Sequence, residues 1–249
     1  MDVDSDVDDA KNHIIYQHKG VKEILKALLQ TPIGIHQIVV YPNNIEILRE
    51  MYFHYIKNLL EESNEIVIFF PYYETADSVK NVLSSSTINK SSSRIKDIDA
   101  NEEKNNRNRK DVTIDIKRYI NNGSLVIIDS DRTFSSEEER TINNQSGKSD
   151  RTINSNNNFA SLVRMSLYHA KRLKKEGITI LADYGLISEK KEYEDLLELE
   201  KSIPPFFDSI KIKQICLYHQ NNFFNKFTRQ QQKELLDLHS RSIMMIDSS

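Results

Sequence analysis

The sequence predicts an α/β protein with a three-layer, doubly wound and mostly parallel sheet. Short apolar segments alternate with amphipathic segments of helical period, and the connections between most of them are short. The apolar segment at 65–71 has almost no polar residue, which is typical of a parallel strand whose two faces are both covered by helices. A chain of 249 residues is long enough for one such domain.

The alternation can be followed along the chain in order. We expect strands at 35–41, 65–71, 124–129, 178–182, 210–217 and 242–246. We expect helices at 21–30, 45–61, 75–83, 112–121, 159–176, 188–201 and 228–239.

Local signals mark several of these boundaries. Asn43 with Glu46 predicts a capped start for the second helix, and Thr228-x-x-Gln231 predicts a capping box. Asn122-Gly123 predicts the end of the helix at 112–121.

The predicted domain begins at residue 34 and runs to residue 249. Residues 1–33 are expected to form an acidic tail and a short helix. Two segments, at about 84–110 and 135–157, are rich in Ser, Asn and charged residues and poor in apolar ones. Such segments bury too little apolar surface to offset the entropy of ordering, so we expect disordered insertions.

Composition excludes several classes of protein. A net charge of −3 and a pI near 6.2 disfavour a direct nucleic-acid binder, which would carry a basic surface. No apolar run approaches the length of a membrane span. The single cysteine, Cys216, rules out an intramolecular disulfide and favours a reducing compartment. We therefore expect a cytoplasmic protein without membrane contact.

The sequence motifs give little support for nucleotide binding or phosphate transfer. Gly147-Lys148-Ser149 resembles part of a P-loop, but Ile142 occupies the position of the required glycine. The segment Asp129-Ser130-Asp131-Arg132-Thr133 follows a strand and resembles the first motif of haloacid-dehalogenase-type phosphohydrolases. There the first carboxylate attacks phosphorus and magnesium lies between the two carboxylates. The motif lies in mid-chain with no downstream acidic metal pair, so a magnesium-dependent phosphohydrolase using Asp129 and Asp131 is an alternative interpretation.

The expected strands end in polar or aromatic side chains. In an open parallel sheet, ligands bind outside the carboxyl ends of the strands. The candidate ligand-binding residues are Tyr41, Tyr72, Asp129, Asp183, Tyr184, Tyr218 and His219.

No metal site and no cofactor are expected. Cys216 lies between Ile215 and Leu217 and is interpreted as a buried, inert thiol. His36 begins a strand, where a capping or buried hydrogen-bonding role is the simpler interpretation. The carboxylates from Glu192 to Glu200 are expected to decorate a solvated helix.

The chain also resembles the MEDS family, the sensory domain of methanogen and methylotroph DcmR-type regulators. The similarity begins at Gly34-Ile35-His36 and covers about 34–247. It is clearest in four segments: Ala182-Asp183-Tyr184-Gly185, the helix at 196–200, Ile215-Cys216-Leu217-Tyr218-His219, and 242–246.

The resemblance implies a RecA/KaiC-like core that lacks the P-loop and a non-catalytic domain that senses a small organic molecule. Related domains are joined to a kinase or a DNA-binding module, and the segment before residue 34 is too short for either. Output is therefore expected to pass through a separate signalling protein, a kinase or a transcription regulator. His36 enters through this family pattern, as a structural residue. A scaffold for protein interactions without a ligand is a further alternative.

Overall fold

The computed structural model describes residues 12–17, 21–85, 114–130, 155–185, 193–202 and 211–246. Its centre is a seven-stranded sheet of order β1-β7-β2-β6-β5-β3-β4, in which every pair of neighbours is parallel. The strands are β1 (Asn12–Gln17), β2 (His36–Tyr41), β3 (Ile66–Phe70), β4 (Leu125–Ile127), β5 (Ile178–Asp183), β6 (Ile212–His219) and β7 (Arg241–Ile246). The predicted parallel sheet is confirmed.

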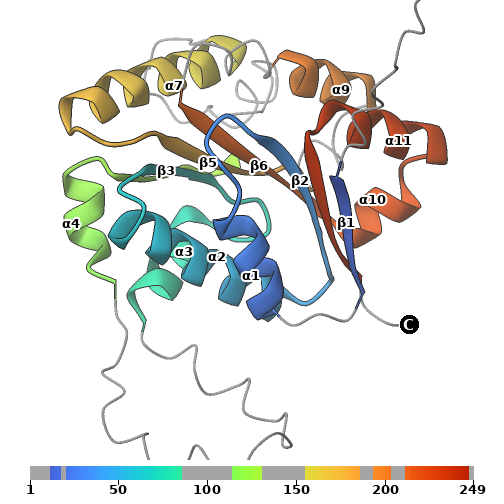
Figure 1. Ribbon diagram of the computed structural model, residues 1–249, viewed down its shortest axis with the longest axis horizontal. Helices are drawn as coiled ribbons and strands as arrows, with labels where there is room; N and C mark the ends of the chain where they lie inside the picture. The colour runs from blue at the N-terminus through green and yellow to red at the C-terminus, as the bar shows by residue number, and fades with distance from the viewer. Residues whose placement is uncertain are drawn as a thin grey trace, which may run out of the picture.

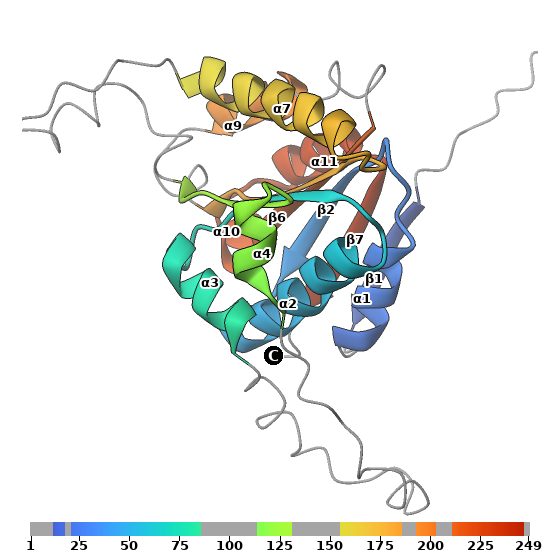
Figure 2. The same ribbon diagram turned by 90° about the vertical axis from the view of Figure 1, so that its left-hand side faces the viewer.

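Helices cover both faces of this sheet, as Figures 1 and 2 show. One layer contains α1 (Val21–Leu29), α2 (Ile45–Glu61), α3 (Ala76–Ser84) and α4 (Ile116–Asn121). The opposite layer contains α7 (Ser155–Arg172), α9 (Tyr193–Ser202), α10 (Gln220–Asn225) and α11 (Arg229–Leu238). The three-layer α/β fold predicted from the sequence is therefore confirmed.

Alternating side chains of strands β2 to β7 belong to two separate hydrophobic cores. On β2, Val39 and Tyr41 join the core beneath α1–α4, whereas Ile38 and Val40 join the core beneath α7–α11. All four are buried. The apolar character of both strand faces, visible in the sequence, follows from this double coverage.

Three local features differ from expectation. β1 was not among the expected strands; it pairs with β7 and extends the sheet by one strand. The N-cap of α2 is Asn44, whose side chain accepts from the Glu46 amide, and not the predicted Asn43. The short helix α10, which follows β6 directly, was not among the expected elements either.

Other expectations fall largely outside the described residues. They concern the acidic segment at 1–11 and most of the two insertions, because the described chain is interrupted at 86–113 and 131–154. The described parts lie at helix ends: residue 84 ends α3, Ser85 is its C-cap, and residues 155–157 begin α7.

A buried ion pair lies inside the sheet layer. Lys213 Nζ on β6 lies 3.2 Å from Glu65 Oε1, and the two side chains are 3% and 5% exposed. Thr179 Oγ1 donates to the other Glu65 oxygen, and Lys213 Nζ also donates to the Thr31 carbonyl at 3.4 Å. The hydrogen bonds compensate part of the cost of removing both charges from water.

Among the described helices, none combines the length and the apolar composition that a bilayer crossing requires.

Candidate functional site

The carboxyl ends of β2, β5 and β6 meet at one edge of the sheet. Tyr41 and His219 are register partners at the ends of β2 and β6. The Tyr41 hydroxyl donates to Asp183 Oδ2 at 2.9 Å, and Asp183 Oδ1 accepts from the Gly185 amide at 3.0 Å. Asp183 is only 1% exposed, so these donors hold a carboxylate inside the protein.

Further aromatic rings lie next to Tyr41, the residue that donates to this carboxylate. The His219 ring lies 5.4 Å from the ring of Tyr41 and 5.0 Å from that of Tyr73. Asn222 Nδ2 of α10 donates to the Tyr73 hydroxyl at 3.1 Å. We call Tyr41, Tyr73, Asp183, His219 and Asn222 the rim cluster. The sequence analysis found three of these residues and missed Tyr73 and Asn222, although Tyr73 follows the same strand as the chosen Tyr72.

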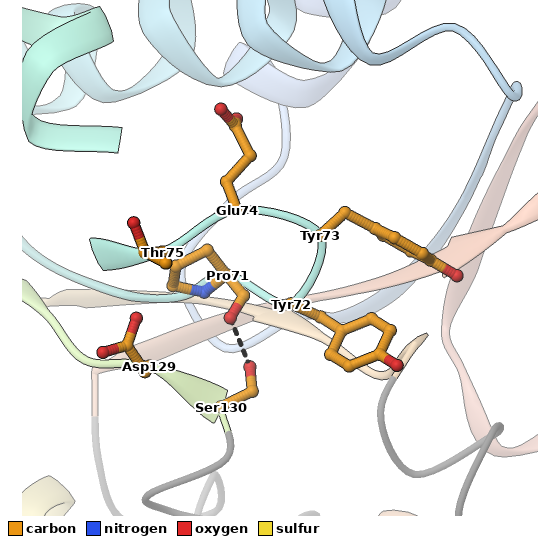
Figure 3. Close-up of a pocket in the computed structure, with 7 residues that line it drawn as sticks. All are labelled: Pro71, Tyr72, Tyr73, Glu74, Thr75, Asp129 and Ser130. Atoms are coloured by element: carbon orange, nitrogen blue, oxygen red, sulfur yellow. Dashed lines mark hydrogen bonds between the residues drawn. The ribbon is translucent and has the colours of Figure 1, made fainter. Parts of the chain in front are cut away.

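A cavity of ≈ 320 Å³ lies next to the rim cluster, beyond the carboxyl ends of β3 and β4 (Figure 3). Its lining consists of seven residues: Pro71, Tyr72, Tyr73, Glu74, Thr75, Asp129 and Ser130. Figure 3 shows Thr75 and Asp129 on one side and the rings of Tyr72 and Tyr73 on the other. The wall therefore combines aromatic surface with a carboxylate.

The carboxylate in this wall also supports a helix start. Asp129 Oδ1 accepts from the amide of Ala76, the first residue of α3, at 2.5 Å. Ser130 Oγ donates to the Pro71 carbonyl at 2.7 Å and joins the two strand ends. Asp131, the second carboxylate of the phosphohydrolase motif, lies outside the described residues, so the structure gives no geometry for the pair.

Glu74 belongs to the cavity lining, but its carboxylate points away from the other lining side chains (Figure 3), toward α2. Its Oε1 accepts from Arg49 Nε and Nη2 at 2.9 and 2.7 Å, and its Oε2 accepts from the Tyr52 hydroxyl at 2.9 Å. Burial, together with the Glu74 carboxylate, raises the pKa of Tyr52 well above its usual range. This network fixes the loop that carries Tyr72 and Tyr73.

Two predicted site residues lie on the other face of the sheet. Tyr184 and Tyr218 belong to the core beneath α7–α11, and their rings are 5.6 Å apart. Burial raises the pKa of both phenols well above the usual value. The predicted set therefore divides into three: Tyr41, Asp183 and His219 in the rim cluster, Tyr72 and Asp129 in the cavity wall, and this buried tyrosine pair.

The tyrosine pair adjoins a polar cluster that the sequence analysis missed. His36, Glu200, Cys216 and His239 are all buried, and one potential ligand atom from each lies within 4.8 Å of all the others. His36 and Cys216 have the buried positions predicted for them, but the expected solvated position of Glu200 is wrong: its side chain is 0% exposed. α9 turns this one carboxylate toward the sheet.

The pKa values of Glu200 and Cys216 in this cluster depend on the neighbouring side chains. Burial alone would raise the pKa of Glu200, but the neighbouring His239 and His36, with the Tyr218 hydrogen bond, lower it to about 2. Burial and the Glu200 charge raise the pKa of the Cys216 thiol well above its ordinary value. Because these residues come from four separate parts of the chain, no spacing in the sequence indicates the cluster.

Comparison with known proteins finds similarity in structure but none in sequence families or curated sequences. No protein-family model matches the sequence. No curated protein matches it either. Among solved structures, the chain is similar to a KaiC-like protein from the hyperthermophilic archaeon Pyrococcus horikoshii, with 12% sequence identity and a TM-score of 0.43 over 76% of this chain. The chain covers 62% of that protein's length. The three-layer fold itself is established by the strand order and the two helical layers.

Proposed function

We propose that the protein is a non-catalytic sensory domain that binds a small organic molecule at the carboxyl edge of its sheet. The cavity between Tyr72, Tyr73 and Asp129 carries this proposal. Its ≈ 320 Å³ falls at the lower end of the size range of small-molecule sites, about 300–1,000 Å³. Its position beyond the strand ends is the usual one for ligands in open α/β sheets.

The lining indicates the chemistry of the ligand. Tyr72 and Tyr73 provide apolar ring surface, and Tyr73 is 38% exposed, so part of its ring is accessible. Asp129 supplies an acceptor group, because a carboxylate has two oxygens that each accept more than one hydrogen bond, and the Ala76 amide donates to Oδ1. A compact molecule with an apolar body and one hydrogen-bond donor, such as an alcohol or an amine, fits this wall.

Signalling would follow from a shift between conformations. The loop 71–75 joins β3 to α3 and is anchored to α2 through Glu74. A ligand that binds one arrangement of this loop better than another changes the population of both arrangements. A separate signalling protein, a kinase or a transcription regulator, would read that change, as the MEDS resemblance implies.

The absence of a P-loop motif supports the non-catalytic assignment. Pro42-Asn43-Asn44 follows β2, where a nucleotide-binding loop would need glycines and a lysine. Asp129 is in contact with the start of α3, which gives it a structural role without any reaction.

A thermal-shift screen of small alcohols and amines on the full chain tests the ligand proposal. We expect at least one compound to raise the melting temperature, since a ligand at 100 times its Kd stabilises the folded state by about 2.7 kcal/mol. Tyr73→Ala should weaken binding of that compound about tenfold or more, and so should Asp129→Asn, which retains an acceptor for the Ala76 amide. Tyr168→Ala is the matched control, because Tyr168 is 74% exposed on α7 in the opposite layer.

If no compound shifts the melting temperature, the ligand-free scaffold interpretation is favoured. Equal binding by wild type and Tyr73→Ala would exclude this cavity as the site. Hydrolysis of an aryl phosphate with Mg²⁺, lost in Asp129→Asn, would overturn the non-catalytic proposal.

A further inference from the structure

We propose that His36, Glu200, Cys216 and His239 form a closed, four-coordinate zinc site between the sheet and the α9–α11 layer. His36 begins β2 and Cys216 lies on the adjacent strand β6. Glu200 lies on α9, and His239 is the C-cap of α11. Two imidazoles, a thiol and a carboxylate make up a ligand set that zinc accepts readily.

Four of the six distances between ligand atoms are close to those of a tetrahedral site, and the other two are no longer than 4.8 Å. His36 Nε2 lies 3.0 Å from Cys216 Sγ and 3.1 Å from Glu200 Oε2. Glu200 Oε2 lies 3.6 Å from Cys216 Sγ and 3.6 Å from His239 Nε2. With usual zinc–nitrogen, zinc–oxygen and zinc–sulfur bond lengths, the edges of a tetrahedron are about 3.3–3.6 Å long. Binding of a metal ion would require side-chain shifts that lengthen the two shortest of these distances.

The tautomer of His239 points to a cation at this position. His239 Nδ1 lies 2.6 Å from the Leu235 carbonyl, which can only accept, so Nδ1 carries a proton and donates. In the neutral ring, Nε2 then presents a lone pair toward Glu200 Oε2. Two lone pairs at this distance repel each other unless a cation lies between them, either a proton or a metal ion. A backbone carbonyl that fixes the second ring nitrogen is the usual support of a metal-binding histidine.

A zinc ion satisfies the charge balance of this cluster. The rings of His36 and His239 have centroids 4.0 Å apart, so both can reach the same ion. A Zn²⁺ ion with the Glu200 carboxylate and a Cys216 thiolate gives a net charge of zero inside the protein. Buried charges are stable when they are paired in this way.

A second set of contacts holds the proposed ligands in place. The Tyr218 hydroxyl donates to Glu200 Oε1 at 2.5 Å, which directs the other oxygen toward the cluster. Gln214 Nε2 donates to Cys216 Sγ at 3.3 Å. Hydrogen bonds of this kind, from residues next to the ligands, fix the orientation of metal ligands in proteins. All four ligands are buried, which indicates a structural site without an open coordination position.

Cobalt substitution of the full-length chain tests the site. We expect the purified chain to contain one equivalent of zinc, and the chelator-treated chain to bind one equivalent of Co²⁺ with the visible spectrum of tetrahedral coordination. A sulfur-to-cobalt charge-transfer band must arise from Cys216, because the chain contains one cysteine. Cys216→Ser should abolish that band, and His239→Gln should weaken Co²⁺ binding at least tenfold. His54→Gln is the control, since His54 lies on α2 in the opposite layer.

Two further measurements keep the proposal testable if a variant fails to fold. On the wild-type chain, zinc should protect the single thiol from a thiol reagent, and chelation should lower the melting temperature. A wild-type chain that binds neither Zn²⁺ nor Co²⁺ stoichiometrically would overturn the proposal and leave a proton-based hydrogen-bond network. Stoichiometric cobalt without the charge-transfer band would overturn it as well, by placing the ion elsewhere.

Discussion

Lys213 and Glu65 bring two opposite charges into the interior, where each depends on the other. Removing both charges from water is costly, and their mutual attraction repays that cost only while both are present. The ring of Tyr55, 5.8 Å from Lys213 Nζ, and the Thr31 carbonyl complete the surroundings of the ammonium group. Strand β6 can accommodate a lysine at a buried position because of these neighbours.

Lys213→Met should therefore destabilise the protein strongly. The substitution leaves the Glu65 carboxylate buried without its cation, and we expect the free energy of unfolding to fall by about 3–5 kcal/mol. Urea denaturation followed by circular dichroism measures the change. Lys57→Met is the control, because Lys57 pairs with Glu61 on the surface of α2, and such pairs contribute about 0–1 kcal/mol. Equal losses in the two variants would show that the buried pair has no special role.

Among the elements, α11 shows how local sequence fixes a helix boundary. Thr228 Oγ1 accepts from the Gln231 amide at 3.3 Å, and Gln231 Oε1 accepts from the Thr228 amide at 2.9 Å. The predicted capping box is thus confirmed, and both partners lie within one turn of the chain. The capping box fixes the N-terminal boundary of α11, whose C-cap is His239.

Thr228→Ala should destabilise the chain by about 1 kcal/mol, because the amide of Gln231 loses its acceptor. Thermal unfolding and urea titration both report this loss. Thr228→Ser keeps a hydroxyl at the same position and should recover most of the stability. A serine variant as unstable as the alanine variant would indicate that the methyl group of Thr228, and not the cap, is responsible.

For the molecule as a whole, the N-terminal strand β1 covers the edge of β7 and is itself the last strand on that side of the sheet. β1 pairs with β7 along its full length, from Asn12 with Arg241 to Gln17 with Ile246. An uncovered edge strand presents unpaired backbone groups that can recruit another chain.

Deleting residues 1–20 should expose the edge of β7. We expect a lower melting temperature and a tendency to self-associate, measured by light scattering during size-exclusion chromatography. Deletion of residues 1–11 is the matched control, because it leaves β1 intact. If both truncated chains are monodisperse and equally stable, β1 does not protect the edge of β7.

Local pattern in the sequence determined the alternation of strands and helices, the coverage of both sheet faces and caps such as Thr228. Each of these depends on residues within one or two turns of one another, or on the two-residue period of a strand. The same pattern identified the rim residues Tyr41, Asp183 and His219, because parallel strands all deliver their carboxyl ends to one edge.

The tertiary structure decided which strands are neighbours and which helical side chains turn inward. The order β1-β7-β2-β6-β5-β3-β4 depends on long crossovers whose destination no local signal encodes. That order places His36 next to Cys216, and the packing of α9 and α11 adds Glu200 and His239. A carboxylate on a helix looks the same in the sequence whether it faces water or the sheet, so only the assembled layers brought these four side chains together.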